Sequence, residues 1–318
     1  QDDLSSRAEK ILEQIRYLAR KYHVVVANPP YMGGGNMNED LKNFAKKHYP
    51  RSKSDLFAMF MERNMELALP GGQLGFMSPF VWMFISSYEK LRHFLIDEKT
   101  ITSLVQLEYS GFDGATVPIC TFTIENDHRP DFKGGYIRLS DFRGSQNQGP
   151  KTLEALRNPD CGWFYRASAE DFKKIPGSPV AYWVSERMRE IFDRSKILGE
   201  VASVVCGMTT GDNAKFVRNW FEVAIEKCGW MVRSSEECAA SGKKWFPYNK
   251  GGDFRKWFGN NIYILNWGNN GRDVIENGRA FPRACQYYFQ ESITWTFISS
   301  SKFGVRSSDS GFIFDMSG

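Results

Sequence analysis

Four consecutive residues, Asn28-Pro29-Pro30-Tyr31, have the chemistry to hold a flat amine. The two prolines restrict the backbone and lack N–H donors, so carbonyl oxygens are left in surplus. The side-chain oxygen of Asn28 and the carbonyl of Pro29 could both accept from one NH2 group, while the Tyr31 ring stacks on the heterocycle that carries it. Such a site favours chemistry on an exocyclic or amide nitrogen. A strand-end turn or a stiff proline loop is the alternative interpretation.

The flanking residues predict where this tetrapeptide lies in the fold. Residues 24–27 form a short apolar run, typical of a strand that is buried on both faces, and a polar, glycine-rich loop covers residues 32–38. We therefore expect the tetrapeptide at the carboxyl end of a parallel strand, which is where ligands bind in open α/β sheets. A helix with an apolar stripe is predicted over 5–22, directly before this strand.

The rest of the first half alternates between helix and strand signals, which predicts an α/β fold. Its last two strands could form an antiparallel hairpin, and the methionines of its most apolar helix are expected in the core. The predicted helices cover 39–47, 55–69 and 88–97, and the predicted strands cover 73–77, 101–108 and 119–125.

The strand, tetrapeptide and glycine loop resemble motif IV of the amino-group methyltransferases that use S-adenosylmethionine, which modify adenine N6, cytosine N4 or a protein glutamine. The loop over 110–118 resembles motif VIII of the adenine enzymes. This resemblance implies that Phe112 stacks on the extruded base opposite Tyr31, with a buried turn aromatic as the alternative. It also implies catalytic roles for Asn28, Pro29, Pro30 and Tyr31.

The resemblance implies a partial Rossmann-like sheet, the C-terminal half of the methyltransferase domain. Asn28 and Pro29 would then border the cofactor S-adenosylmethionine. The glycine-rich turn and the acidic residue that hold the rest of this cofactor are not found and are expected before Gln1, so the chain alone is expected to be inactive. The strand at 24–27 would have an unpaired edge, for which we expect pairing with another copy, cover by a displaced segment, or aggregation.

Two basic stretches are candidates for contacts with DNA. The first follows the glycine loop and could guide phosphates to the site, with a solvated loop as the alternative. The second, within 242–261, interleaves cations with aromatic residues that could stack on unpaired bases; its alternative is a β-rich core with a basic face. The predicted contacts are Lys46, Lys47, Arg51, Lys53, Lys243, Lys244, Lys250, Arg255, Lys256 and Trp257.

Together with motif IV, the helix at 55–69 and the motif VIII loop, the tract at 248–267 resembles the adenine-specific methyltransferases of BREX phage-defence systems, related to type II and IIG restriction-modification enzymes. Three domains are predicted. Residues 1–126 would be the end of the catalytic domain, 127–180 a loop-rich connector with one strand over 135–140, and 181–318 a β-rich α+β target-recognition domain that is incomplete at its C-terminus.

Composition sets limits without identifying a function. The chain has 318 residues and a net charge of +4, which fits a polyanionic partner. Its six cysteines include no C-x-x-C pair, so no metal site is expected. No membrane span or signal peptide is apparent, so a cytoplasmic location is expected.

The predicted function is that of a fragment of a site-specific N6-adenine DNA methyltransferase acting on double-stranded DNA in phage defence or restriction-modification. Other phage-defence subunits are further candidate partners. One alternative is a protein glutamine N5-methyltransferase, because a glutamine amide presents the same NH2 geometry; the aromatic and basic residues after 180 argue against it. The other is a noncatalytic DNA-binding module.

Overall fold

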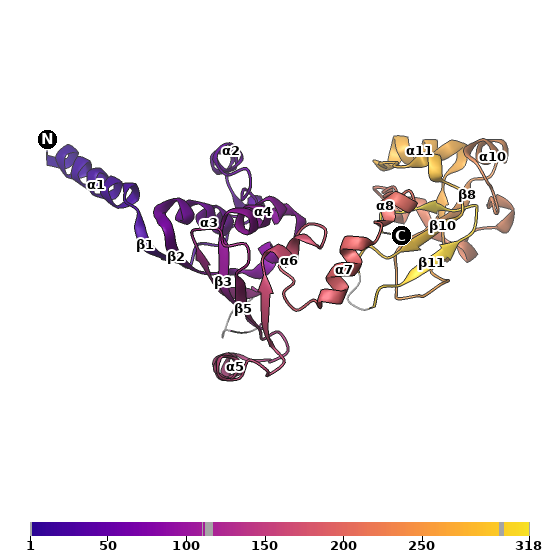
Figure 1. The fold of residues 1–318 in the computed structure, drawn as a ribbon. Helices are drawn as coiled ribbons and strands as arrows, with labels where there is room; N and C mark the ends of the chain where they lie inside the picture. The colour runs from indigo at the N-terminus through magenta and orange to yellow at the C-terminus, as the bar shows by residue number, and fades with distance from the viewer. Residues whose placement is uncertain (1, 110, 112–116, 299–301, 318) are drawn as a thin grey trace. The chain divides into compact units, whose positions relative to one another are not determined.

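The computed structural model describes residues 2–109, 111, 117–298 and 302–317 (Figure 1). The chain forms two compact units, Gln1–Lys196 and Ile197–Gly318. Within the described residues, no helix combines the length and the apolar character that crossing a membrane would require.

Unit 1 is built on a six-stranded mixed sheet of order β1-β2-β4-β3-β5-β6. The pairs β1/β2 and β3/β5 are parallel, whereas β2/β4, β3/β4 and β5/β6 are antiparallel. The expected parallel strand before the tetrapeptide and the expected hairpin are both confirmed. The strands are β1 Tyr22–Ala27, β2 Ala68–Pro79, β3 Thr100–Gln106, β4 Ile119–Glu125, β5 Lys133–Arg138 and β6 Phe164–Ser168.

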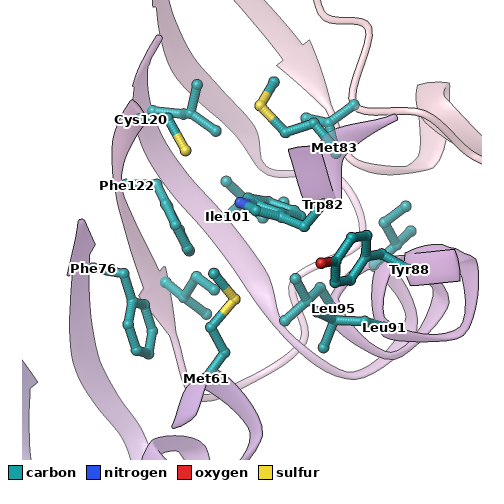
Figure 2. Packing of buried hydrophobic residues seen from close by; sticks show 14 of the residues in the cluster. Met61, Phe76, Trp82, Met83, Tyr88, Leu91, Leu95, Ile101, Cys120 and Phe122 are labelled. Atoms are coloured by element: carbon teal, nitrogen blue, oxygen red, sulfur yellow. The ribbon is translucent and has the colours of Figure 1, made fainter. Parts of the chain in front are cut away.

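The helices of unit 1 place its main core on one face of this sheet. Side chains of α3 and α4 pack on β2, β3 and β4, with the buried indole of Trp82 among them, 5.0 Å from the ring of Phe122 between ring centres (Figure 2). The helices are α1 Asp2–Ala19, α2 Glu39–His48, α3 Leu56–Leu67, α4 Glu89–Glu98, α5 Ser145–Arg157, α6 Glu170–Lys173 and α7 Glu186–Arg194. Short 3-10 turns cover Gly34–Asn36, Phe80–Met83 and Ser86–Tyr88.

Strand β1 is buried on one face only, so the expectation of burial on both faces is wrong for this chain. Val25 and Ala27 pack against the core, but Val24 and Val26 are 61% and 77% exposed. Side chains alternate between the two faces of a strand, and no described helix covers the face on which Val24 and Val26 lie. β1 is also the edge strand, as expected, because β2 is its one partner among the described strands.

The segment expected to be a loop-rich connector, 127–180, contributes two strands to the sheet of unit 1: β5, which overlaps the strand predicted over 135–140, and β6, which was not predicted. Its glycines suggested loops, but Gly134 lies in β5, where a Cβ atom would come within 2.6 Å of the carbonyl oxygen of Ile101. Glycine is therefore needed there for close strand approach and does not mark a turn. The compact unit ends at Lys196, later than the predicted boundary near 180.

Unit 2 has the expected β-rich α+β character. A four-stranded sheet of order β12-β8-β9-β7 lies beside a two-stranded sheet, β10-β11. The strands are β7 Val217–Asn219, β8 Trp245–Asn249, β9 Tyr263–Asn266, β10 Ser292–Trp295, β11 Val305–Ser308 and β12 Ile313–Phe314. The helices are α8 Leu198–Val201, α9 Asn213–Phe216, α10 Ser235–Ala240 and α11 Gly268–Gly278, and 3-10 turns cover Trp220–Glu222, Ile225–Lys227 and Cys285–Tyr287.

Candidate amine site and nucleic-acid interface

The tetrapeptide follows β1 directly and therefore lies at the carboxyl end of a parallel strand. Ala27 is in register with Phe76 of β2, so the tetrapeptide leaves the sheet beside the end of β2. Pro29 is buried, whereas Asn28, Pro30 and Tyr31 are exposed. A rigid proline is thus anchored in the fold while the polar amide and the ring face solvent.

Asn28 and Tyr31 are bonded to each other, which the sequence did not predict. The Tyr31 hydroxyl donates to Oδ1 of Asn28 at 3.0 Å, and the carbonyl oxygen of Met77 lies 3.4 Å from the same hydroxyl. An amide oxygen has two lone pairs, so Asn28 can accept one more hydrogen bond. Burial raises the pKa of Tyr31, with a smaller effect of Cys120 in the same direction, so its hydroxyl is a neutral donor at physiological pH.

The Tyr31 ring rests on buried aromatic residues. Phe57, in the first turn of α3, meets it edge-on with ring centres 6.3 Å apart and an interplanar angle of 86°. Phe57 in turn contacts Tyr88, just before α4, at 5.7 Å. The ring is therefore supported from one side, and it is 36% exposed.

Asp55 links the tetrapeptide loop to α3. Its Oδ1 accepts from the backbone N–H of Met32 at 2.9 Å and from that of Phe57 at 3.1 Å. One carboxylate oxygen therefore caps the helix and holds the residue that follows Tyr31. The sequence contained a signal for this role, because an Asp directly before an apolar helical pattern is an N-cap signature.

An open trough of about 300 Å³ runs along the uncovered face of the sheet beside Asn28. It exists because Gly75 has no side chain and its neighbours Thr121, Thr123 and Ser103 are small. None of the residues that line the trough is charged. Phe112, the predicted second stacking residue, lies outside the described residues.

The first basic stretch, 46–53, contains both solvent-exposed cations and a cation that is paired within the fold. Lys46 and Lys47, in the last turn of α2, and Lys53 are exposed. Arg51 instead pairs with the buried Glu62 at 3.2 Å and with Glu98 at 3.6 Å, and its guanidinium lies 4.2 Å from the ring centre of Phe94. Arg51 is therefore held by the fold, which weakens its assignment as a phosphate contact.

The second stretch is likewise part core and part surface. Phe246 and Tyr248, on β8, are fully buried, whereas Lys244, Arg255, Lys256 and Trp257 are exposed. The interpretation of the tract as core is correct for its first half only.

Two lysines of this tract are engaged within unit 2. Lys243 donates to the carbonyl oxygen of Glu226 at 2.7 Å, and Lys250 pairs with the buried Asp315 at 3.0 Å. Burial alone would raise the pKa of Asp315, but hydrogen bonds from Ser317, Tyr248 and Lys250 outweigh this effect and hold the pKa below its usual range. Lys250 therefore stabilises a buried carboxylate, which weakens its assignment to DNA.

Comparisons with known proteins identify relatives for nearly the whole chain. Residues 1–112 match the family of the Eco57I restriction-modification methylase. The chain is 39% identical to the adenine-specific methyltransferase PglX of Lacticaseibacillus casei (strain Zhang) over 95% of its own length and 26% of that protein. It is 41% identical to the adenine-specific methyltransferase BrxX of Escherichia coli O9:H4 (strain HS) over 96% of its own length and 24% of that protein.

Solved structures show the same fold at low sequence identity. The DrdV–DNA complex matches 97% of this chain and 36% of that chain, with a TM-score of 0.52 and 12% identity. The Type ISP restriction-modification enzyme LlaGI matches 94% of this chain and 29% of that chain, with the same TM-score and identity. The sequence matches carry the comparison: over nearly its whole length the chain is a relative of the proteins named as adenine-specific methyltransferases PglX and BrxX, and it spans about a quarter of their length.

Proposed function

We propose that this chain is the amine-binding and DNA-contacting part of a site-specific N6-adenine DNA methyltransferase of a phage-defence or restriction-modification system. The observation that carries the proposal is the placement of Asn28 and Tyr31, bonded to each other, at the carboxyl end of β1. The names of PglX and BrxX, both adenine-specific, favour adenine over the glutamine alternative.

In this proposal the target adenine leaves the duplex, at a cost of a few kcal/mol, and its amino group approaches Asn28. The free lone pair of Asn28 Oδ1 and the carbonyl oxygen of Pro29 each accept a hydrogen bond from one of the two amino N–H groups. These two hydrogen bonds leave the nitrogen lone pair free to act as a nucleophile, and they stabilise the positive charge that develops on the nitrogen. Tyr31 stacks on one face of the base, and Phe112 stays the predicted partner on the other.

The methyl donor of this enzyme class, S-adenosylmethionine, fits the described trough only in part. The cofactor carries a sulfonium, an ammonium and a carboxylate, and none of the described residues that line the trough beside Asn28 has a charged side chain to pair with them. These residues therefore do not fit the whole cofactor, and we assign dependence on it to the longer protein.

We further propose that both units contact double-stranded DNA and that unit 2 reads the target sequence. The exposed cations are suited to phosphates, and the matched structures of DrdV and LlaGI hold DNA or a DNA mimic. Other phage-defence subunits stay candidate partners. The proposed phosphate contacts are Lys46, Lys47, Lys53, Lys244, Arg255 and Lys256.

The proposal is tested by Asn28→Ala in the full-length protein. Losing an acceptor that acts on the reacting amine should lower the methylation rate about 100-fold or more, while the Kd for DNA changes less than about 3-fold. Asn36→Ala, an exposed residue of the same loop, is the matched control and should leave both unchanged. If DNA affinity falls as much as the rate, the tetrapeptide has a structural role and the proposal fails.

A further inference from the structure

Trp257 has a backbone conformation that large residues rarely adopt. Its φ is 74°, in the left-handed region, where a side chain with a Cβ is strained. Neighbouring strand β11 holds this conformation through two backbone hydrogen bonds. The N–H of Trp257 donates to the carbonyl oxygen of Val305 at 2.7 Å, and the carbonyl oxygen of Trp257 accepts from the backbone N–H of Ser307 at 2.9 Å. The strain is therefore built into the loop and is not a fraying end.

The strained residue contributes little to the core of unit 2. The Trp257 side chain is 66% exposed and that of Phe258 is 69% exposed, although Phe246 and Tyr248 of the same tract are fully buried. Burial therefore does not offset the strain, which is the pattern expected where a conformation serves contact with a ligand. The backbone presents a large flat ring to solvent.

The surroundings of the ring indicate what it would contact. The Lys256 ammonium lies 4.8 Å from the centre of the Trp257 ring, and Arg255 is exposed beside it. A flat apolar ring next to two cations matches a ligand that combines a flat heterocycle with an anionic backbone. An apolar protein surface would match the ring but would leave both cations without partners.

We propose that Trp257 is a stacking platform for an unpaired base of DNA, with Arg255 and Lys256 on the adjacent phosphates. This inference rests on the DNA binding in the proposed function and is independent of methyl transfer. It gives Trp257 a role separate from that of Tyr31, which lies in the other unit and is proposed to stack on the reacting adenine.

The test measures binding of the 318-residue chain to a short single-stranded oligodeoxynucleotide that carries one 2-aminopurine, whose emission falls when it stacks. Trp257→Asn removes the ring and places a residue that tolerates a positive φ. This variant should raise Kd about 10-fold or more, abolish the fall in emission and leave the salt dependence unchanged. Its Tm should be at or above that of the parent, because strain is relieved and little packing is lost.

Three further variants separate stacking from charge and from general exposure. Trp257→Phe keeps a ring and should stay within about 3-fold of the parent Kd. Arg255→Gln combined with Lys256→Gln should flatten the salt dependence and keep the change in emission. Trp220→Asn, at another exposed tryptophan of unit 2, should change neither the Kd nor the fall in emission.

Each contrary result has a definite meaning. If Trp257→Asn binds like the parent, the stacking role is wrong while DNA binding stands. If it lowers Tm by several degrees, the ring is a packing element and the inference fails. If the parent chain binds duplex DNA but not this oligodeoxynucleotide, the stacking role is wrong while the proposed function stands; if it binds neither, both fail. Loss of self-association in Trp257→Asn, with emission unaffected, would assign the ring to a protein contact.

Discussion

At the scale of single residues, the candidate site depends on one hydrogen bond. The Tyr31 hydroxyl fixes the orientation of the Asn28 amide, so that Oδ1 and not the NH2 group is held in place beside the ring. An amide free to rotate would present a donor as often as an acceptor to an incoming amine. Tyr31 therefore has two separable roles, because its ring can stack and its hydroxyl orients the acceptor.

Tyr31→Phe in the full-length protein separates these roles. Removing the hydroxyl but keeping the ring should lower the methylation rate about 3- to 10-fold, the value of one neutral hydrogen bond. The Kd for DNA should not change. Tyr31→Ala, which also removes the ring, should cost more. Equal losses in the two variants would show that the hydroxyl alone matters.

The same hydrogen bond should contribute equally to the rate over a wide range of pH. The pKa of Tyr31 is raised above its ordinary value of 10.0. The hydroxyl therefore stays protonated through the neutral and mildly alkaline range, and the hydrogen bond to Asn28 is lost only when the pH exceeds the raised pKa. The ratio of wild-type to Tyr31→Phe rates should therefore be constant between about pH 6 and pH 9. A ratio that falls within this range would contradict the assigned hydrogen bond.

At the scale of elements, Asp55 makes the start of α3 and the tetrapeptide loop one structural piece. Two backbone hydrogen bonds also join the loop to the start of α3. The N–H of Gly34 donates to the carbonyl oxygen of Ser54 at 3.0 Å, and the N–H of Leu56 donates to the carbonyl oxygen of Met32 at 3.0 Å. Phe57 then brings the same helix end under the Tyr31 ring. Helix α3 thus positions the tetrapeptide loop and the Tyr31 ring.

Asp55→Ala should therefore affect both stability and activity. Losing the N-cap and the bond to Met32 should lower the free energy of unfolding by about 1 to 3 kcal/mol, measured by urea denaturation. Methylation by the full-length protein should also fall. Asp55→Asn should restore both, because an amide oxygen can accept the same two hydrogen bonds. If the Asn variant is as damaged as the Ala variant, the carboxylate charge matters and the capping role is wrong.

At the scale of the whole molecule, unit 1 leaves apolar surface and a strand edge uncovered. Among the described strands β1 has a neighbour on one side only, Val24 and Val26 face solvent, and α1 exposes an apolar stripe that includes Ile11, Ile15 and Leu18. An edge strand with apolar neighbours is a template for pairing with another chain.

We expect the chain to self-associate through β1, with an apparent mass in sedimentation that rises with concentration. Val24→Lys combined with Val26→Lys should reduce this association, because charge on an edge strand opposes pairing. Val201→Lys combined with Val204→Lys, at exposed positions in unit 2, is the matched control. A parent chain that stays monomeric at all concentrations would contradict the assignment of β1 as an open edge.

The sequence alone predicted the parts of this protein that depend on neighbours in the chain. The apolar run before Asn28 and the helix signals of 55–69 are local, and the structure has strand β1 directly before Asn28 and helix α3 over Leu56–Leu67. The antiparallel pair β3 and β4 was also predictable, because its strands are consecutive. Local pattern thus identified the tetrapeptide and the sheet that holds it.

Only the tertiary structure decided which side chains are free to act. Lys250 is engaged by Asp315, 65 residues away, and the loop after Tyr31 is held by Asp55, 23 residues from its partner Met32. Gly134 lies in a strand because β3 approaches it closely, and Trp257 is exposed because β11 holds its backbone. The spacing of residue types along a chain determines local conformation, but the partners of a buried charge or an exposed ring come from segments that only folding brings together.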